Sequence, residues 1–541
     1  MKKALSLILA LCMLFALAAC TQNESPNTTP EGTGSQNETD PGGQDSAETE
    51  SGYIDILNVG TAEVLGYPQW GSTSSFIGPY YYLIYDPIFY FAGSELDSDV
   101  LEEWHFEDDG YTLVMTLRDC VYFSNGAQAT GEDLLYSFTS NLDPDRNSTY
   151  AASYYAHLDA DASSVGDDGF TVYLKSDGDA TMVTQIGNLV MTPLMSKEWC
   201  EQVGWVSEEW YSGPVGSGPY AVEEYKTDNY YLFSLREDWW MADESVMPAK
   251  QIKYTAYSEA STMYMDLEGG AIDLAITPAS SDYERALSDD KIGTQTLNGN
   301  VTQWLVFDEE DSPFTDINLR KAVAHAVKWD EVASAGKGVL WDEADSSIPE
   351  YFPDYLSVGE YEYDPDLAKQ YLEAAGYSEG ELELYMVCTS QAVPSITVLQ
   401  HYLDQIGIVM TFDGLELSTV IQERTKGTGD FDYYAMSGGS QARDSYAIYS
   451  ALLSSARIKN CQTVTDTTLD DLLAKAAASS TTEEARGYYQ ELQQWIYDSY
   501  RLIPIFDNIS TCVYNNSVIS SANIVNQQYP NLRNIEFAAQ P

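Results

Sequence analysis

A single long apolar run, Ala4 to Ala19, opens the chain behind Lys2 and Lys3 and stops at Cys20. This pattern is typical of a secretory signal, which we assign to residues 1–19. The run is somewhat shorter than the ~20 apolar residues of a membrane-spanning helix, and no later segment approaches its length. Everything after it must therefore fold in water, which excludes a polytopic membrane protein.

The residues before Cys20 resemble the recognition site of the bacterial lipoprotein signal peptidase, because small side chains precede the cysteine in Leu17-Ala18-Ala19-Cys20. This resemblance implies that Cys20 becomes the lipidated N-terminus of the mature protein. Several acyl chains, each contributing ~0.8 kcal/mol per buried methylene, hold such an N-terminus on the membrane. We therefore expect an extracytoplasmic protein, anchored to the outer face of the bacterial cell membrane and periplasmic in a Gram-negative cell.

Residues 21–52 consist of small polar residues, prolines, glycines and acids, without an aromatic or basic side chain. A segment of this composition cannot bury enough apolar surface to fold. We therefore interpret residues 20–52 as the lipidated cysteine followed by a disordered acidic linker that keeps the folded part away from the membrane.

The charge of the chain narrows the possible classes of protein further. The chain has 26 basic and 84 acidic residues, a formal net charge of −58. Such an excess of acids makes nucleic-acid binding untenable. We interpret the acids as a solvated surface, with adaptation to salt as an open alternative.

Five cysteines follow Cys20 at wide spacings that match neither a disulfide framework nor a zinc site. We interpret them as small buried side chains, and the sequence leaves their disulfide state open. They are Cys120, Cys200, Cys388, Cys461 and Cys512.

Several segments carry clear local signals of secondary structure. Asp108-Asp109-Gly110 separates two runs of alternating apolar residues and predicts a β-hairpin. Thr130, with an acid three residues later, predicts the start of a helix. Another helix is expected after Asp316, with an apolar stripe of which Arg320 is not part.

Two further helices follow in the second half. Asp364-Pro365 opens one that Gly376 closes. The other extends from about Glu483 to Tyr500, and the apolar run from Leu502 to Phe506 after it predicts a buried strand. Strands and helices mix throughout without a short repeat, so the fold class is α/β or α+β.

These elements carry a family pattern in order and spacing across nearly the whole mature chain. The chain resembles the family 5 solute-binding proteins, the peptide- and nickel-binding components of ABC importers. Motifs that carry the resemblance include Tyr85-Asp86-Pro87-Ile88-Phe89-Tyr90, Phe123-Ser124-Asn125-Gly126, Gly216-Ser217-Gly218-Pro219-Tyr220, Tyr363-Asp364-Pro365 and Gly429-Asp430-Phe431-Asp432.

The resemblance implies an α/β, two-lobed periplasmic-binding-protein-like fold of type II, with the ligand enclosed between the lobes by hinge closure. By analogy, residues 53–300 form the first lobe with an inserted subdomain near residues 90–213. Residues 301–504 form the second lobe, and residues 505–541 return to the first. We expect a monomer that uses no cofactor and no metal of its own, and that delivers its ligand to an ABC permease and ATPase complex.

In peptide-binding members, one stretch of the second lobe carries a Gly-Trp pair and an aspartate that takes the peptide's amino terminus. Here Met436 replaces the tryptophan, Gly439 stands in place of the aspartate, and Asp444 follows beside Arg443. Either Asp444 pairs with the ligand's ammonium in a shifted loop, or the ligand is not an ordinary peptide. Two interpretations of Arg443 are also open: it binds a ligand carboxylate through two hydrogen bonds, or it forms a solvent-exposed ion pair with Asp444.

The candidate ligand residues come from both lobes. The second lobe provides Met436, Ser437, Gly438, Gly439, Arg443, Asp444 and Tyr446, and the first provides Tyr67, Trp70 and Tyr80. For the first-lobe aromatic residues, core packing is the competing interpretation.

An oligopeptide or dipeptide is the expected ligand. A metal chelate, a sugar or another small molecule is the alternative, as is a surface sensor without a transport role. We do not expect an enzyme, because the four histidines lie far apart and the sequence contains neither Gly-x-Ser-x-Gly nor His-Glu-x-x-His.

Overall fold

The computed structural model describes most of the chain after residue 53. The described residues are 54–62, 65–66, 80–92, 95–146, 148, 151–178, 180–190, 192–205, 207–242, 249–307, 312–416, 419–420, 422–423, 431–435, 445–452, 467–522 and 532–538. They all belong to one compact unit, Gly52–Pro541, and the predicted signal and linker lie outside the described residues.

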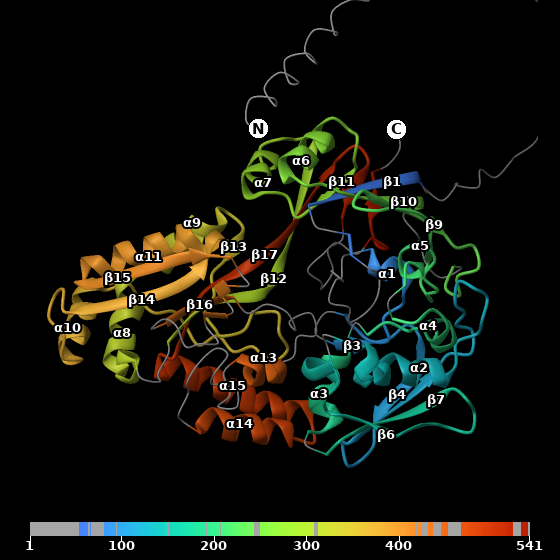
Figure 1. Cartoon of the computed structure of the whole chain (residues 1–541), viewed down its shortest axis with the longest axis horizontal. Coiled ribbons are helices and arrows are strands. Elements are labelled where there is room, and N and C mark those ends of the chain that lie inside the picture. Colours follow the sequence, from blue (N-terminus) through green and yellow to red (C-terminus); the bar gives the residue numbers. More distant parts are fainter. Residues whose placement is uncertain are drawn as a thin grey trace, which may run out of the picture. The chain divides into compact units, whose positions relative to one another are not determined.

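A large mixed sheet organises the described chain (Figure 1). Its strand order is β16-β12-β17-β11-β1-β10-β9-β8, and β13 pairs with β17. Strand β1 is parallel to β10 and β11, and the other pairs are antiparallel. The strands are β1 (Ile54–Thr61), β8 (Tyr220–Lys226), β9 (Tyr230–Leu235), β10 (Ala249–Ala256), β11 (Leu274–Ile276), β12 (Ile292–Phe307), β13 (Trp341–Asp342), β16 (Phe431–Ala435) and β17 (Leu502–Asn515).

Smaller sheets lie outside the large one. An antiparallel sheet has the order β4-β5-β7-β6, from β4 (Leu101–Phe106), β5 (Thr112–Leu117), β6 (Leu158–Val165) and β7 (Thr171–Ser176). A βαβ unit joins the parallel strands β14 (Leu382–Thr389) and β15 (Ile408–Leu415) through helix α11 (Val393–Gln405). Two short antiparallel pairs are β2 (Tyr90–Ala92) with β3 (Glu95–Asp97), and β18 (Ile519–Ser521) with β19 (Glu536–Phe537).

Helices cover these sheets. In the first part of the chain they are α1 (Tyr81–Ile84), α2 (Gly131–Thr139), α3 (Met182–Leu189), α4 (Lys197–Val203), α5 (Glu209–Ser212), α6 (Ala260–Glu268) and α7 (Ser280–Ala286). Later helices are α8 (Ile317–Ala326), α9 (Trp329–Lys337), α10 (Pro365–Ala374), α13 (Ser445–Leu452), α14 (Thr468–Ala477) and α15 (Thr482–Ser499). No helix among the described residues is long and apolar enough to cross a bilayer.

The buried apolar side chains form two groups of clusters. One group takes its residues from Leu57 to Ile292 and again from Cys512 to Ile535. The other takes them from Trp304 to Phe506. Strands β12 and β17 supply residues to both groups, so this long antiparallel pair connects two separately packed core regions. The lobe boundaries expected near residues 300 and 505 fall inside these two strands.

Most local predictions from the sequence are confirmed. The turn at Gly110, which has a φ of +73°, joins β4 and β5 as an antiparallel hairpin. A capping box joins Thr130 and Asp133 at the start of α2, and Asp316 caps α8. The Asp364 side chain accepts hydrogen bonds from two backbone N–H groups of α10.

Two details differ from the expectations. The strand expected at Leu502–Phe506 continues to Asn515, because β12 and β11 provide partners for its later residues. Arg320, expected off the apolar stripe of its helix, is buried, and its guanidinium donates hydrogen bonds to the backbone carbonyls of Phe314 and Ser499. Both differences arise from partners that are distant in sequence.

The interpretation of the cysteines as small buried side chains is confirmed in part. Cys200, Cys388 and Cys512 are free and buried, as expected for small core side chains. Cys120 is free but exposed, which contradicts the expectation of burial, because it lies in the turn after β5. Cys461 lies outside the described residues.

Candidate functional site

Strands β12 and β17 form the connection on which a closing motion would depend. They pair from Ile292↔Asn515 to Val306↔Leu502, and the register is interrupted between Asn298 and Thr302 and again at Gln303. Such irregularities bend a strand pair and increase its twist. The interruptions therefore bend the pair where it passes from one core region to the other.

A buried carboxyl group lies at this irregular segment. Asp507 of β17 accepts a hydrogen bond from the Thr302 hydroxyl of β12 at 2.5 Å and is 8% exposed. Burial raises the pKa of Asp507 to about 8, and the carboxylates of Asp342, Asp345 and Glu350 add to the rise, while the hydrogen bond from Thr302 opposes it. Asp507 is therefore largely protonated near neutral pH.

A cavity of about 230 Å³ lies between segments of the two core regions. One wall comes from β2, β3 and α3, with Phe91, Leu96, Val183, Thr184, Ile186 and Gly187. The other comes from α15 and the segment before α10, with Pro353, Asp354, Thr482, Ala485, Arg486 and Tyr489. A pocket lined from both core regions is the geometry expected for an enclosed ligand.

The charged side chains of this cavity all belong to the wall that contains α15. Asp354 Oδ2 accepts a hydrogen bond from the Ser445 hydroxyl at 2.8 Å, and the Gln493 amide donates to the Asp354 backbone carbonyl at 2.8 Å. Arg486 Nε lies 3.8 Å from Asp354 Oδ1. Burial raises the pKa of Asp354, whereas Ser445 and Arg486 oppose that rise.

Helices α3 and α14 meet next to this cavity. The Thr181 N–H, at the N-terminus of α3, donates to the Ala477 carbonyl at the C-terminus of α14 at 3.0 Å. The Thr181 hydroxyl donates to the Ser479 carbonyl at 2.8 Å, and both residues are buried. The positive end of one helix dipole thus faces the negative end of the other, a favourable arrangement. We call this set of contacts the α3–α14 junction.

Most of the predicted ligand residues lie outside the described part of the chain. These are Tyr67, Trp70, Met436, Ser437, Gly438, Gly439, Arg443 and Asp444. The structure describes the residues directly after them, where Ser445 begins α13 and contacts Asp354. Tyr446 is half-buried and packs against the core that contains α14 and α15.

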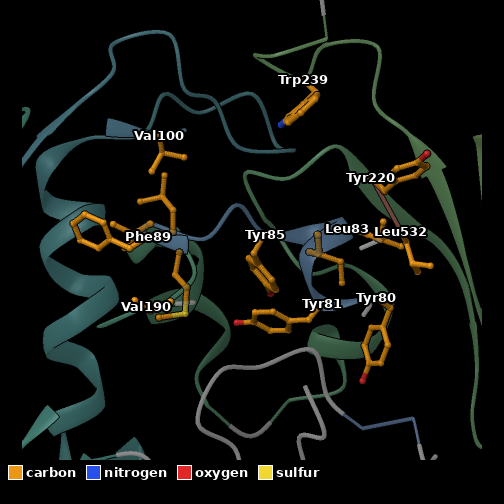
Figure 2. Close-up of a cluster of buried hydrophobic side chains, with 14 of the residues drawn as sticks. Tyr80, Tyr81, Leu83, Tyr85, Phe89, Val100, Val190, Tyr220, Trp239 and Leu532 are labelled. Carbon is orange, nitrogen blue, oxygen red and sulfur yellow. The ribbon is translucent and has the colours of Figure 1, made fainter. Parts of the chain in front are cut away.

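Tyr80 is the other predicted ligand residue that the structure describes. Its ring centroid lies 5.4 Å from that of Tyr231 and 5.2 Å from that of Tyr254, and its side chain is buried. Figure 2 shows it within the same apolar cluster as Tyr81 and Tyr85. Tyr80 therefore has a packing role here, and its assignment to the ligand stays a prediction.

Sequence reasoning did not identify Asp354 and Arg486. They are 132 positions apart and lie in segments without a motif, so only the fold brings them together. The signal in the sequence is weak: Arg486 follows the N-terminal turn of a helix that the apolar stripe predicts.

A second, larger cavity of about 380 Å³ lies elsewhere. Its residues come from segments 327–330, 341–344 and 359–363 and from Pro504 and Ile505. All of them belong to the part of the chain between β12 and the middle of β17, so this cavity is lined from one core region only. Among the described residues, no group of three or more His, Cys, Asp or Glu side chains is arranged to hold a metal ion.

Comparison with known proteins decides the family. The family described as "Bacterial extracellular solute-binding proteins, family 5 Middle" matches residues 95–460 of the chain. The chain belongs to this family. Family membership makes it a solute-binding protein, and the prediction from the sequence motifs is confirmed.

Individual relatives of this solute-binding protein are distant. Heme-binding protein A of Haemophilus influenzae is 24% identical over 444 residues, which cover 77% of this chain and 80% of the relative. Di/tripeptide-binding protein 2 of Pseudomonas aeruginosa is 22% identical over 430 residues, which cover 75% of this chain and 80% of the relative. The names of these relatives therefore include more than one class of ligand.

The fold of this solute-binding protein matches solved structures. The crystal structure of the ABC transporter substrate binding protein CtaP from Listeria monocytogenes superposes with a TM-score of 0.77 at 19% identity, covering 90% of this chain and 100% of that chain. This likeness confirms the predicted two-lobed periplasmic-binding-protein fold of mixed α/β class. The family consists of binding proteins, which is consistent with the expectation that the chain is not an enzyme.

Proposed function

We propose that this chain is the substrate-binding component of an ABC importer and that it captures a dipeptide or short oligopeptide between its two lobes. The observation that carries this proposal is the cavity lined from both core regions, in a chain that belongs to the family 5 solute-binding proteins. A peptide is the favoured ligand because a di/tripeptide-binding protein is among its relatives and because the cavity offers both charges and an apolar wall.

A non-peptide ligand is the second candidate. It is favoured by the relative named for heme and by the replacement of the expected tryptophan and aspartate with Met436 and Gly439. A metal chelate, a sugar or another small molecule belongs to this alternative. A surface sensor that uses the same fold without transport is a further alternative, which loss of peptide uptake on gene deletion would exclude.

The experiment that tests the proposal combines calorimetry with small-angle scattering. A panel of dipeptides and tripeptides is titrated into the purified protein, and the radius of gyration is measured with and without saturating peptide. We expect binding, a smaller radius and a higher melting temperature, because a ligand shifts the population only through its greater affinity for the closed state. Binding of heme or a metal chelate in place of every peptide would favour the second candidate.

The lobes follow from the same proposal. The first lobe contains residues 53–300 and 505–541, with the inserted subdomain at about 90–213, and the second contains residues 301–504. The two boundaries lie within β12 and β17, where the register interruptions give the pair its bend.

Within the second lobe, Asp444 pairs with the ammonium of a bound peptide, or Arg443 pairs with its carboxylate. Replacing Asp444 with alanine is then expected to weaken binding by about 2 to 5 kcal/mol, because it leaves a buried ammonium without its partner. Calorimetry of Asp444→Ala and Arg443→Ala with free and terminally blocked peptides separates these roles. Unchanged affinity in both variants would remove this stretch from the site.

Attachment to the membrane is through Cys20. The lipidated N-terminus and the acidic linker place the binding protein near an ABC permease and ATPase complex on the outer face of the membrane. Cys20→Ser is expected to move the protein from the membrane fraction to the soluble fraction. An intact mass that shows an unmodified mature N-terminus in the wild type would contradict this assignment.

A further inference from the structure

The cavity between α3 and α15 contains one pair of opposite charges whose partners do not fully engage each other. The distance of 3.8 Å between Arg486 Nε and Asp354 Oδ1 is beyond a hydrogen bond. The Arg486 side chain is 44% exposed, and that of Asp354 is 16% exposed. Each group therefore keeps hydrogen-bonding capacity that the other does not use, and both groups line the cavity.

The surroundings of the pair fix one partner and leave the other adjustable. Ser445 donates to one carboxylate oxygen of Asp354, and Gln493 holds its backbone carbonyl, so the carboxylate has a defined position. Arg486 extends from the exposed first half of α15 and presents a planar fork of donors. A fixed carboxylate beside an adjustable guanidinium suits a ligand that brings a cation to the first and an anion to the second.

The opposite wall has different chemistry. Phe91 and Leu96 from β2 and β3, together with Val183 and Ile186 from α3, present apolar surface to the cavity. Such a wall accepts an aliphatic or aromatic group and offers no charged partner. The cavity therefore has one charged end and one apolar side, contributed by different core regions.

We infer that Asp354 and Arg486, in place of Asp444 or Arg443, form a subsite that binds the amino and carboxylate groups of a small zwitterionic ligand, a dipeptide or free amino acid, whose apolar side chain contacts the wall formed by β2, β3 and α3. This inference deepens the proposed function and rests on it. A zwitterion matches both charges, whereas a ligand with one charge leaves the other protein group desolvated without compensation. The volume of about 230 Å³ lies below the usual range of roughly 300 to 1,000 Å³ for larger ligands, which favours a ligand of this size.

An internal supporting role is the competing explanation of the pair. A supporting ion pair would be close and bidentate, because only such geometry gives a guanidinium and a carboxylate their strongest interaction. The separation of 3.8 Å and the exposure of Arg486 do not match that description. Removal of Arg486 should accordingly affect ligand binding more than folding.

The experiment uses the full chain and three probes: the dipeptide Leu-Leu, N-acetyl-Leu-Leu and Leu-Leu amide. Isothermal titration calorimetry is performed on the wild type, Arg486→Gln and Asp354→Asn. The matched control is Arg285→Gln, which removes the same charge from an exposed pair with Glu268 on α6 and α7. Melting temperatures establish that each variant is folded.

We expect wild type and control to bind Leu-Leu at least about tenfold more tightly than either blocked probe, as loss of a charged hydrogen bond predicts. Arg486→Gln should lose about tenfold for Leu-Leu and show no further loss with the amide. Asp354→Asn should likewise lose about tenfold in affinity for Leu-Leu and show no further loss with N-acetyl-Leu-Leu. If Asp354→Asn fails to fold, Arg486→Gln with the amide decides the question alone.

Failure of this inference and failure of the proposed function give different results in this experiment. A wild type that binds none of the three probes overturns the dipeptide assignment of the proposed function and this inference together. A wild type that binds Leu-Leu, with Arg486→Gln matching the control on all three probes, overturns this inference and leaves the proposed function in place.

Discussion

Asp507 gives the most direct test of the energetics at the β12–β17 connection. Its carboxyl group is buried opposite Asp342 of β13 and accepts a hydrogen bond from the hydroxyl of Thr302. Replacing Asp507 with asparagine keeps the shape and the oxygen that Thr302 contacts, but removes the ability to ionise. The variant therefore isolates the contribution of one buried titratable group.

The size and sign of the effect follow from the pKa. Burial moves the pKa of Asp507 from 3.8 to about 8, and each pH unit of difference corresponds to about 1.4 kcal/mol. Between these two values the folded protein holds a proton that the unfolded chain releases, so the free energy of unfolding falls as the pH rises. The loss accumulates from about pH 4 to about pH 8 and reaches about 2 to 5 kcal/mol, since relaxation around a newly formed charge reduces the ideal value.

The measurement is denaturant unfolding from pH 5 to pH 9 for the wild type, Asp507→Asn and Asp161→Asn. Asp161→Asn removes the same charge at an exposed position of β6 and serves as the control. We expect the stability of Asp507→Asn relative to the wild type to increase with pH up to about 8 and then to level off. Parallel stability curves for Asp507→Asn and the wild type over the whole range would refute the reasoning.

Three other substitutions probe the fold and its closure. Asp86→Ala should lower the free energy of unfolding by about 3 to 5 kcal/mol, because it removes the buried carboxylate that Arg533 contacts at 2.8 Å; unchanged denaturant midpoints would contradict this. Thr181→Val should weaken ligand binding about two- to tenfold, because it removes one hydrogen bond at the α3–α14 junction. The control, Ser196→Ala at the N-cap of α4, should leave the affinity measured by calorimetry unchanged. Gly218→Ala should destabilise the protein by about 1 to 3 kcal/mol, because its Cβ would lie 2.6 Å from the backbone of α1; a melting temperature equal to that of the wild type would exclude this clash.

The sequence predicted those elements whose signals are local. Thr130 with Asp133, and Asp364 with Pro365, satisfy the free N–H groups of a helix terminus from within four residues, so their pattern is sufficient to find α2 and α10. The turn at Gly110 is local in the same sense. Family motifs then supplied the arrangement of these elements, which no periodicity could provide.

Non-local partners account for what the sequence did not predict. Arg320 lies off an apolar stripe, where no local signal indicates burial, yet the carbonyl of Ser499, 179 residues later, accepts a hydrogen bond from its guanidinium. The second half of β17 has fewer apolar signals of its own and is a strand because β12 and β11 pair with it. Asp354 and Arg486 became neighbours for the same reason.

We expect closure and recognition to depend on different residues, and ligand titrations can measure this difference. Contacts at the α3–α14 junction involve no group of the cavity's charged end, so we expect a change at Thr181 to alter the fraction of closed protein. A smaller closed fraction weakens the apparent affinity for every ligand by the same factor. A change at Arg486, by contrast, alters the contacts of ligands that present a carboxylate there and leaves the others almost unaffected. Across one panel of free and blocked dipeptides, Thr181→Val should therefore shift all dissociation constants in parallel, whereas Arg486→Gln should change their order. A change of order in Thr181→Val would mean that the substitution also displaces the apolar wall that α3 contributes, and a parallel shift in Arg486→Gln would mean that this arginine acts on closure.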